Sequence, residues 1–313
     1  MAIKSIAITG ATGLLGAHLA NSYVESGDQV FALVRDEHSK SILSSSVIKV
    51  SGDISRKSDI EYFIQKSNPN YFFHLAAQTQ AYDSLTYPYQ TFFNNIVGTL
   101  NVLECLREFK SAEVIVVASS NKAYGEMQSD TYKEDHPLNG IYPYDASKSA
   151  TDLVSNSYRN TYGMPIVVTR PCNIYGKGDY NRQRLIPGIV NAYLRDEEFI
   201  IRNSGQDLRE YIHVNDVVSA NRLVVSLVEN FSPSSSFNIA SEDRYTTIQV
   251  FQLVEEIIGK PIRHKILYST SMEIKKQFMD STRLRQEAGW VPKNKFQEIL
   301  PDTVRWYLDH YKR

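Results

Sequence analysis

The chain has 313 residues, of which 42% are apolar and 22% are charged, and its net charge is −1. This length and composition predict a globular enzyme with two unequal lobes, or one large α/β unit with an elaboration. No basic tract is present and no apolar run approaches the roughly 20 residues that span a bilayer, so we expect no nucleic-acid and no membrane partner. The chain starts directly with a strand, and its two cysteines lack disulfide or metal-ligand spacing. A cytoplasmic protein without a metal site is therefore predicted.

Apolar strands alternate with amphipathic helices over residues 1–171. The strands are predicted at 4–9, 28–34, 47–53, 70–77, 112–119 and 164–170, and the clearest helices at 14–26, 91–109 and 144–163. This alternation predicts an α/β fold with a Rossmann-type, doubly wound parallel sheet that is covered by helices on both faces.

The pattern changes after Pro171, where loops rich in Gly, Asn and Arg occupy residues 173–184. The elements predicted beyond these loops are strands at 198–203 and 235–240 and helices at 185–195, 213–230, 247–259 and 299–311. We therefore expect residues 1–171 to bind a cofactor and residues 172–313 to form a smaller C-terminal α+β substrate lobe. The chain is expected to return to the first unit around residues 207–240.

The segment ITGATGLLG places Gly10, Gly13 and Gly16 in a GxxGxxG pattern between the first strand and the first helix. Such glycines allow a tight turn and a close approach of the backbone N–H groups to a pyrophosphate at the helix N-terminus. The pattern in this context predicts a dinucleotide site. The other residues of the turn that we expect to contact the dinucleotide are Thr12, Leu14 and Leu15.

The second and third strands end in residues that face the adenosine of a bound dinucleotide in this type of fold. An acid such as Asp36 binds the ribose hydroxyls of NAD, whereas an arginine such as Arg35 favours the 2′-phosphate of NADP. Both are present, so the pair does not decide between the two cofactors. Asp53 and Ile54 are expected beside the adenine, with a helix N-cap as the alternative role of Asp53.

Tyr144 and Lys148 form a YxxxK pair on a predicted helix, where residues i and i+4 share one face. A lysine ammonium beneath the phenol would lower the phenol pKa from about 10 toward neutrality and make Tyr144 a usable base. Ser120 lies at the end of the fifth strand and is expected in the same pocket. The three residues together predict proton transfer next to a nicotinamide.

These motifs resemble those of the extended short-chain dehydrogenases/reductases, in particular the nucleotide-sugar epimerase/dehydratase family. The resemblance rests on GxxGxxG, HLAAQ, NNIVGT, SSNKAYG, YxxxK, RPCNIYG, LREYIHVND and GWVP. It implies that Ser120 polarises a sugar hydroxyl, Tyr144 takes its proton and Lys148 holds the nicotinamide ribose. It implies NAD as the cofactor, with NADP as the alternative. It also places Leu75, Ala76, Ala77, Gln78, Asn95, Ser119 and Pro171 in the cofactor site.

The resemblance further implies that the second lobe binds a nucleotide-diphosphate sugar, with CDP, GDP, UDP or dTDP as the nucleotide. Asn173 and Arg209 match diphosphate-binding residues, and Arg184 lies in a loop that clamps the sugar and the base. A surface ion pair with Glu210 or Asp207 is the alternative role of Arg209. The remaining residues expected to contact the substrate are Gln78, Ser120, Asn121, Lys122, Leu185 and Arg202.

The segments ASSNKAYG and GKGDYNRQRLIP most resemble CDP-glucose 4,6-dehydratases, which oxidise C4 and then eliminate water across C5–C6. Lys122 fits the base of that elimination. Asn121 stands where those enzymes have an aspartic acid, and an amide cannot protonate a leaving hydroxyl. Epimerisation at C4 or C2 is therefore the alternative to dehydration. A net NADP-dependent reductase and a non-catalytic nucleotide sensor are weaker alternatives.

The predicted helices at 91–109 and 144–163 carry more apolar residues than one sheet face requires. Together with the family resemblance, this surplus leads us to expect a homodimer that forms through these two helices.

Overall fold

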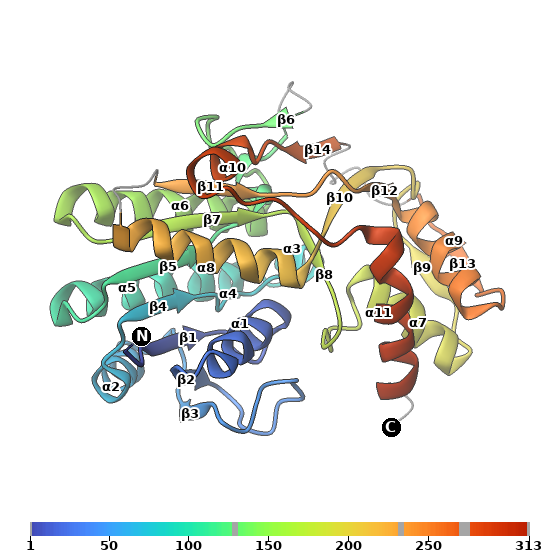
Figure 1. The fold of residues 1–313 in the computed structure, drawn as a ribbon. Coiled ribbons are helices and arrows are strands. Elements are labelled where there is room, and N and C mark those ends of the chain that lie inside the picture. The colour runs from blue at the N-terminus through green and yellow to red at the C-terminus, as the bar shows by residue number, and fades with distance from the viewer. Residues whose placement is uncertain (1, 127–130, 231–234, 269–275, 312–313) are drawn as a thin grey trace.

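The computed structural model describes residues 2–126, 131–230, 235–268 and 276–311. Its largest unit is a seven-stranded sheet with the strand order β11-β7-β5-β4-β1-β2-β3, in which every neighbouring pair is parallel (Figure 1). The strands are β1 Ser5–Thr9, β2 Gln29–Val34, β3 Ile48–Ser51, β4 Tyr71–His74, β5 Val114–Ala118, β7 Ile166–Pro171 and β11 Ser236–Ile239. The predicted Rossmann-type fold is confirmed.

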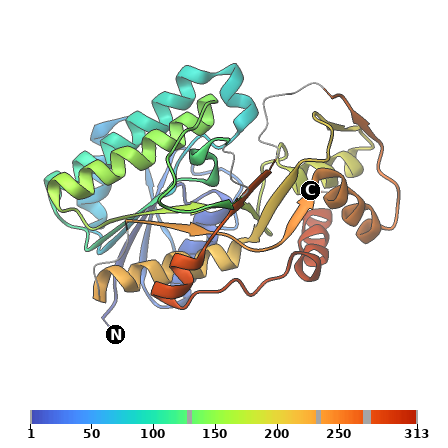
Figure 2. The same ribbon diagram turned by 90° about the horizontal axis from the view of Figure 1, so that it is seen from above.

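Both faces of the sheet are buried beneath helices, which explains the nearly continuous apolar strands. Ile6 and Ile8 of β1 pack in one core with α1 (Leu14–Glu25) and α8 (Val214–Asn230), whereas Ala7 packs in the other with α2 (Lys57–Ser67) and α5 (Gly98–Phe109). The long helix α6 (Pro143–Tyr162) lies beside α5 on this second face, with α8 on the opposite side (Figure 2).

The C-terminal half of the chain contributes to both units. Helix α8 and strand β11, which pairs with β7, belong to the large sheet. The smaller lobe has its own core, formed largely by three helices and the strand β10 (Leu208–His213). These helices are α7 (Leu185–Arg195), α9 (Thr247–Ile258) and α11 (Phe296–His310). The other strands outside the large sheet are β6 Thr131–Tyr132, β8 Asn173–Tyr175, β9 Phe199–Ile201, β12 Arg244–Thr246, β13 His264–Ile266 and β14 Lys276–Met279.

The helix predicted over 91–109 is confirmed, and it contains a π-helical turn. Helix α4 (Pro88–Phe92) ends at the π turn Phe93–Val97, and α5 follows it. The turn exposes the carbonyl of Asn95 to two hydroxyls, since Thr99 Oγ1 donates to it at 2.6 Å and Thr151 Oγ1 at 3.3 Å. Such π turns are frequent near functional sites, and this one reaches the cavity wall.

A buried ion pair joins α6 to β7 in the centre of the molecule. Arg170 Nε and Nη2 donate to the two carboxylate oxygens of Asp152 at 2.7 and 2.9 Å, and both side chains are at most 3% exposed. Arg170 Nη1 also donates to the hydroxyl of Tyr124 at 2.6 Å, and that hydroxyl donates to Asn238 of β11 at 2.7 Å. The network ties together the helix, two strands and the turn that carries Asn121.

Replacing Asp152 with asparagine is expected to lower the free energy of unfolding by about 3–5 kcal/mol, because it leaves a buried guanidinium without its counter-charge. Urea denaturation measures this change. The matched control is Asp302→Asn, which removes the acid of an exposed pair with Arg305 at 3.4 Å. If Asp152→Asn lowers the free energy of unfolding no more than the control does, the buried charge of Asp152 does not stabilise the fold as stated.

Glu210 of β10 is fully buried, with one carboxylate oxygen accepting from the backbone N–H of Met279 at 3.1 Å. Burial raises the pKa of this carboxyl to about 8. The folded chain therefore binds a proton between pH 4.5 and 8 that the unfolded chain has released, and its stability falls as the pH rises through that window.

Glu210→Gln is expected to flatten this pH dependence and to be the more stable form above pH 8. Thermal unfolding across the same window tests it, with the exposed Glu256→Gln on α9 as the control. Parallel curves for Glu210→Gln and the unaltered chain would show that the carboxyl does not titrate as stated.

Candidate active site

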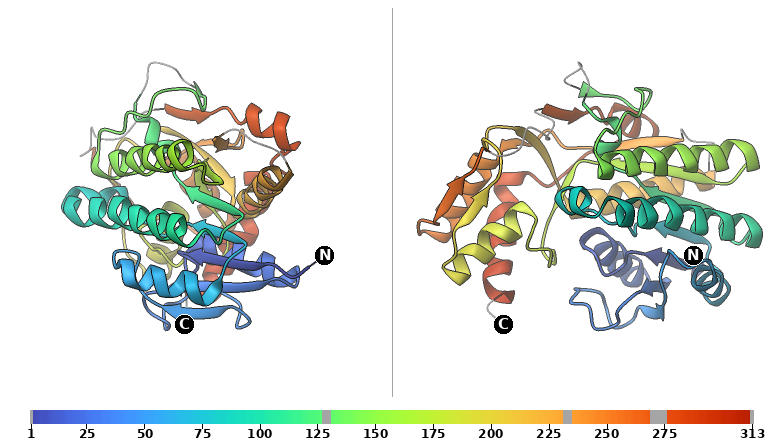
Figure 3. Two further views of the ribbon diagram at one scale, coloured as in Figure 1. Left: turned by 90° about the vertical axis from the view of Figure 1, so that its left-hand side faces the viewer. Right: turned by 180° about the vertical axis from the view of Figure 1, so that it is seen from behind.

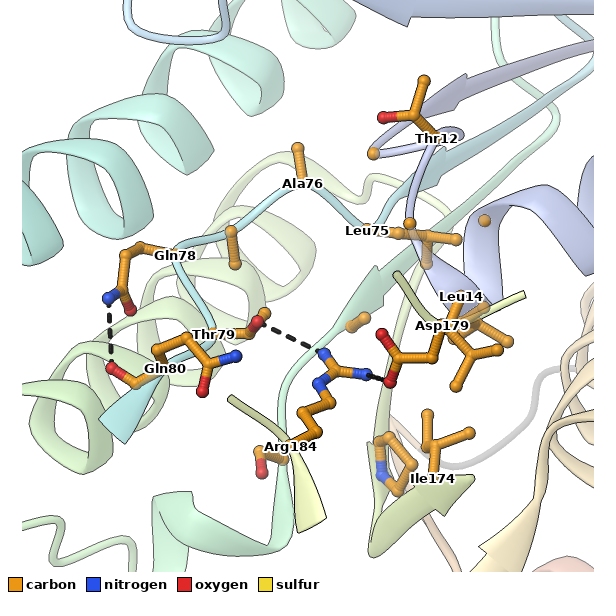
Figure 4. Close-up of a pocket in the computed structure, with 18 of the residues that line it drawn as sticks. Thr12, Leu14, Leu75, Ala76, Gln78, Thr79, Gln80, Ile174, Asp179 and Arg184 are labelled. Carbon is orange, nitrogen blue, oxygen red and sulfur yellow. Dashed lines mark hydrogen bonds and ion pairs between the residues drawn. The ribbon is translucent and has the colours of Figure 1, made fainter. Parts of the chain in front are cut away.

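A cavity of about 710 Å³ lies at the carboxyl ends of β1, β4 and β5. The strand order reverses between β1 and β4, and ligands of open α/β sheets bind at such a switch point. Figure 4 shows part of its lining, with Thr12 and Leu14 near Leu75 and Ala76, and with the Arg184 side chain between Thr79 and Asp179. The residues predicted from the sequence that line the cavity are Gly10, Thr12, Gly13, Leu14, Leu15, Gly16, Arg35, Asp36, Asp53, Ile54, Leu75, Ala76, Ala77, Gln78, Ser119, Ser120, Asn121, Lys122, Tyr144, Lys148, Pro171, Asn173, Arg184 and Leu185.

The glycine turn has the shape that a pyrophosphate requires. Gly10 has a φ of +75°, and a Cβ there would lie 2.7 Å from the backbone nitrogen of Ala76. A Cβ on Gly16 would lie 2.2 Å from the carbonyl oxygen of Gly10. Neither position tolerates a side chain, so the backbone N–H groups at the start of α1 stay accessible to an anion.

The adenosine end of the cavity is lined by Arg35, Asp36 and Asp53. Asp36 accepts a hydrogen bond from the backbone N–H of His38 at 2.9 Å, which fixes its carboxylate at the end of β2. Asp53 accepts from the backbone N–H of Ser55 at 2.8 Å in a turn, and α2 begins four residues later with Arg56 as its N-cap. The alternative role of Asp53 as a helix cap is therefore wrong.

Ser120, Tyr144 and Lys148 meet where β5 ends beside the first turns of α6. Lys148 Nζ donates to the carbonyl of Ala118 at 2.8 Å, and Ser119 Oγ donates to the carbonyl of Lys148 at 3.2 Å. The hydroxyls of Ser120 and Tyr144 interact, and this interaction favours the ionised phenol. The site thus holds a hydroxyl pair next to a buried amine.

The predicted near-neutral pKa of the Tyr144 phenol is wrong for this structure. Burial raises the pKa of Tyr144 to about 12, and it lowers the pKa of the Lys148 amine to about 8. A lysine with a pKa near 8 is still mostly protonated at neutral pH, so burial of the phenol itself is what keeps the pKa of Tyr144 high. Arg184 exerts the lowering effect of a nearby cation on the pKa of Tyr144, while Asp145 opposes it.

Asn121 and Lys122 line the cavity from the 3₁₀ turn that follows β5. Ser120 Oγ donates to Asn121 Oδ1 at 3.1 Å and accepts from the backbone N–H of Lys122 at 3.2 Å. The Nδ2 of Asn121 is buried and has no hydrogen-bond partner among the described residues. It remains available as a donor to a bound ligand. Asp145 is buried close enough to Lys122 for the lysine charge to act on it, and burial raises the pKa of Asp145 to about 6.

Three predicted contact residues lie outside the cavity lining. Asn95 is buried behind the wall, where Nδ2 donates to the carbonyl of Gln78 at 3.0 Å and Oδ1 accepts from its N–H at 2.7 Å. Arg202 lies over the ring of Tyr82 at 4.3 Å. Nη2 of Arg209 lies 3.7 Å from Oδ2 of Asp207, which is one of the two ion pairs given above as the alternative role of Arg209. Asn95 fixes the wall, and the two arginines are held by neighbouring residues.

The structure also brings residues to the cavity that the sequence patterns did not identify. Thr79 and Gln80 follow directly after the HLAAQ motif, so their place in the cavity could have been predicted from the position of that motif. Asp179 and Tyr307 come from a loop and the last helix of the second lobe, and no local pattern marks them. The additional lining residues of the second lobe are Ile174, Tyr175, Asp179, Ile186, Pro187, Tyr211 and Tyr307.

Comparison with known proteins assigns the chain to a family. The model of the NAD dependent epimerase/dehydratase family matches residues 6–240. The chain belongs to this family. This epimerase/dehydratase is 26% identical to a dTDP-glucose 4,6-dehydratase of Haemophilus influenzae, over 98% of this chain and 98% of that protein. It has a TM-score of 0.88 and 27% identity to a UDP-glucose 4-epimerase of Thermotoga maritima, covering 98% and 99% of the two chains.

One plant relative is longer than this chain, which matches only part of it. It is a trifunctional UDP-glucose 4,6-dehydratase/UDP-4-keto-6-deoxy-D-glucose 3,5-epimerase/UDP-4-keto-L-rhamnose-reductase of Arabidopsis thaliana, 26% identical over 98% of this chain. The epimerase/dehydratase described here spans 48% of that protein's length. The resemblance inferred from the motifs is confirmed by these matches.

NAD is the cofactor of this epimerase/dehydratase, and the NADP alternative is set aside. The turn at Gly10 and Gly16 fits the pyrophosphate, Asp36 lies where the adenosine ribose is expected, and Lys148 would hold the nicotinamide ribose. Bound there, NAD supplies the hydride acceptor.

In the described part of the chain, no helix is long and apolar enough to cross a membrane. Residues 2–126, 131–230, 235–268 and 276–311 contain no cluster of His, Cys, Asp or Glu suited to a metal ion.

Proposed function

We propose that the protein is an NAD-dependent 4,6-dehydratase of a nucleotide-diphosphate hexose. The observation that carries the proposal is that Lys122 lines the same cavity as Ser120 and Tyr144. Oxidation of a sugar at C4 makes the proton at C5 acidic, and a second proton-transfer group beside the first is what the elimination of water then requires. The match to a dTDP-glucose 4,6-dehydratase over nearly the whole of both chains supports the proposal.

In this proposal each residue has a defined task. Tyr144 accepts the proton of the C4 hydroxyl, which Ser120 holds by a hydrogen bond. Lys122 removes the proton from C5 when its amine is neutral, and the ammonium so formed gives that proton to the hydroxyl that leaves C6 as water. The hydride taken from C4 would then return to C6, and C5 regains a proton in exchange for the one that Tyr144 accepted. The free Nδ2 of Asn121 donates a hydrogen bond to the oxygen that leaves C6, Asn173 binds the diphosphate, and Arg184 contacts the sugar and the base.

Epimerisation through the same 4-keto intermediate is the second candidate, and Asn121 is the observation that favours it. An amide holds the 6-hydroxyl in place but gives it no proton, so it favours return of the hydride without loss of water. The match in fold to a UDP-glucose 4-epimerase is compatible with this candidate.

Incubation with NAD and with the CDP, GDP, UDP and dTDP derivatives of glucose tests the proposal. Mass spectrometry of the product is expected to show the loss of one water. An isomer with the mass of the substrate in ordinary water would replace dehydration by epimerisation; in heavy water it is expected to carry one deuterium at carbon if C2 is inverted and none if C4 is inverted. The glucose derivative that reacts fastest identifies the nucleotide.

The outer face of α5 and α6 supports the further proposal that two chains form a homodimer. The two helices lie side by side on the outside of the molecule (Figure 3). Their exposed apolar side chains are Leu100, Phe109, Leu153 and Tyr162, between 36% and 59% exposed. Exposed apolar side chains on two adjacent helices are compatible with an interface between two chains. Light scattering measures the mass in solution, and the mass of one chain would contradict the dimer.

A further inference from the structure

Gln277 reaches the active-site turn from a strand near the C-terminal end of the chain. It lies on β14, which pairs with β10 on one side and with β6 on the other (Figure 1). Its Nε2 donates to the backbone carbonyl of Asn121 at 2.7 Å, across 156 positions of the chain. The two residues are 1% and 3% exposed, so water does not compete for this bond. Gln277 is not among the described residues that line the cavity, and it contacts one that does.

The turn that receives this bond carries the groups assigned to the second half of the reaction. Asn121 and Lys122 line the cavity from its first two positions. Ser120, which serves the first half, is the N-cap of the turn and comes two residues after β5. The backbone N–H of the preceding Ser119 donates to the carbonyl of Thr169 on β7 at 2.8 Å. The large sheet therefore fixes the chain up to Ser120, and the turn beyond it needs contacts of its own.

Two separate contacts hold the backbone of this turn. Near its end, the carbonyl of Ala123 accepts from Oγ of Ser149 on α6 at 2.7 Å and from the N–H of Asn139 at 3.1 Å. At its start, the carbonyl of Asn121 accepts from Gln277. The bond from Gln277 is thus the side-chain contact to the backbone at the residue whose side chain faces the sugar.

The other polar atom of the Gln277 side chain shows what the amide contributes. Its Oε1 is buried and has no hydrogen-bond partner among the described residues. A buried acceptor without a partner destabilises a fold, so an apolar side chain of the same length would satisfy the packing better. Such groups are few in native proteins, and a role in function is one reason for their presence. The contribution of the amide is therefore its donor, and that donor binds the turn.

We propose that Gln277 is a positioning residue: its bond to the carbonyl of Asn121 fixes the turn so that the side chains of Asn121 and Lys122 face C5 and C6 of the sugar. The inference rests on the proposed function for the steps at these two carbons. Oxidation at C4 uses Ser120 and Tyr144, which β5 and α6 hold in place, so it depends less on this bond. A misplacement of about 1 Å slows a reaction on the order of 10²-fold. Loss of the donor is therefore expected to slow the elimination of water more than the oxidation that precedes it.

Gln277→Met tests this expectation, because it removes the donor and the unpaired acceptor together and keeps the length of the side chain. With NAD and the sugar nucleotide that reacts, the absorbance of reduced cofactor in the first turnover measures oxidation, and mass spectrometry measures the dehydrated sugar. The ratio of the elimination rate to the oxidation rate is expected to fall about tenfold or more. Equal losses in both rates would show that Gln277 supports only the fold, and they would overturn the inference.

The matched control is Asn221→Leu on α8. It also removes a buried amide, whose Nδ2 donates to the carbonyl of Val217 at 2.7 Å, and the described lining of the cavity does not include it. Its ratio of elimination to oxidation is expected to match that of the unaltered chain. An equal fall of the ratio in the control would assign the effect to a general loss of stability and contradict the role of Gln277.

Gln277→Glu gives a pH profile that a purely structural role would not produce. A protonated carboxyl donates to the carbonyl of Asn121 as the amide does, whereas an ionised carboxylate has no donor. Compared with the unaltered chain at the same pH, the ratio of elimination to oxidation is expected to fall as the pH rises through the pKa of the new carboxyl. A ratio that follows the unaltered chain at every pH would contradict the inference.

Hydrogen exchange followed by mass spectrometry tests the anchoring of the turn without a substrate. In the NAD-loaded protein, peptides that cover residues 119–126 are expected to exchange faster in Gln277→Met and at the unaltered rate in Asn221→Leu. Exchange in Gln277→Met as slow as in the unaltered chain would overturn the inference. If the unaltered chain yields only an isomer while the exchange difference is present, the proposed function fails and the anchoring of the turn by Gln277 stands.

Discussion

Replacing Tyr144 with phenylalanine is expected to lower the rate of sugar oxidation by about 10²–10⁴-fold, the usual contribution of a general base. The ring is 8% exposed, so phenylalanine keeps the packing and removes only the hydroxyl that interacts with Ser120. The absorbance of reduced cofactor during the first turnover measures the effect.

The control for this variant is Tyr142→Phe, the N-cap position of α6, whose residue does not line the cavity in the described structure. Its rate is expected to match that of the unaltered chain. A Tyr144→Phe enzyme that keeps more than about a tenth of the rate would show that another group accepts the proton.

Asn121→Asp is expected to raise the rate of water elimination by about 10²–10⁴-fold, because it replaces a hydrogen-bond donor by an acid that can protonate the leaving hydroxyl. Position 121 is 3% exposed, and burial raises the pKa of a carboxyl, so a larger share of the new group is protonated than of an exposed aspartic acid. Mass spectrometry of the product against time measures the ratio of dehydrated to isomeric sugar.

Asn94→Asp makes the same chemical change at another position of the cavity wall, so it separates the effect of a proton donor from that of added charge. It is expected to leave the product ratio unchanged. If Asn121→Asp yields no more dehydrated product than the control, the leaving hydroxyl does not lie beside residue 121. Epimerisation would then be the better account of the site.

Local patterns were sufficient for the parts of the site that depend on neighbours in sequence. The glycine turn after β1 was predictable because only glycine tolerates the φ of Gly10 and the close contact at Gly16. Tyr144 and Lys148 were predictable because a helix brings residues i and i+4 to one face. Ser120 was predictable as a polar residue at the end of a buried strand.

Burial changed the electrostatics that these patterns predicted. The amine of Lys148 donates to the carbonyl of Ala118, and burial lowers its pKa to about 8, while burial of the Tyr144 phenol raises the phenol pKa to about 12. Desolvation depends on every element packed around a group, and no spacing in the sequence encodes it. The predicted pKa of Tyr144 was wrong for this reason.

The sequence by itself determined the parallel sheet, the NAD turn and the YxxxK pair, because each follows from residues that are close along the chain. Only the tertiary structure decided which distant side chains face the cavity. In the folded chain Arg202 lies over Tyr82, and Arg209 lies beside Asp207. Asn95 lies in a π turn behind the cavity wall. Arg184 lies between Asp179 and Thr79. The bond between Arg184 and Thr79 spans 105 positions of the chain, and such contacts are fixed by how the two lobes pack rather than by any local periodicity.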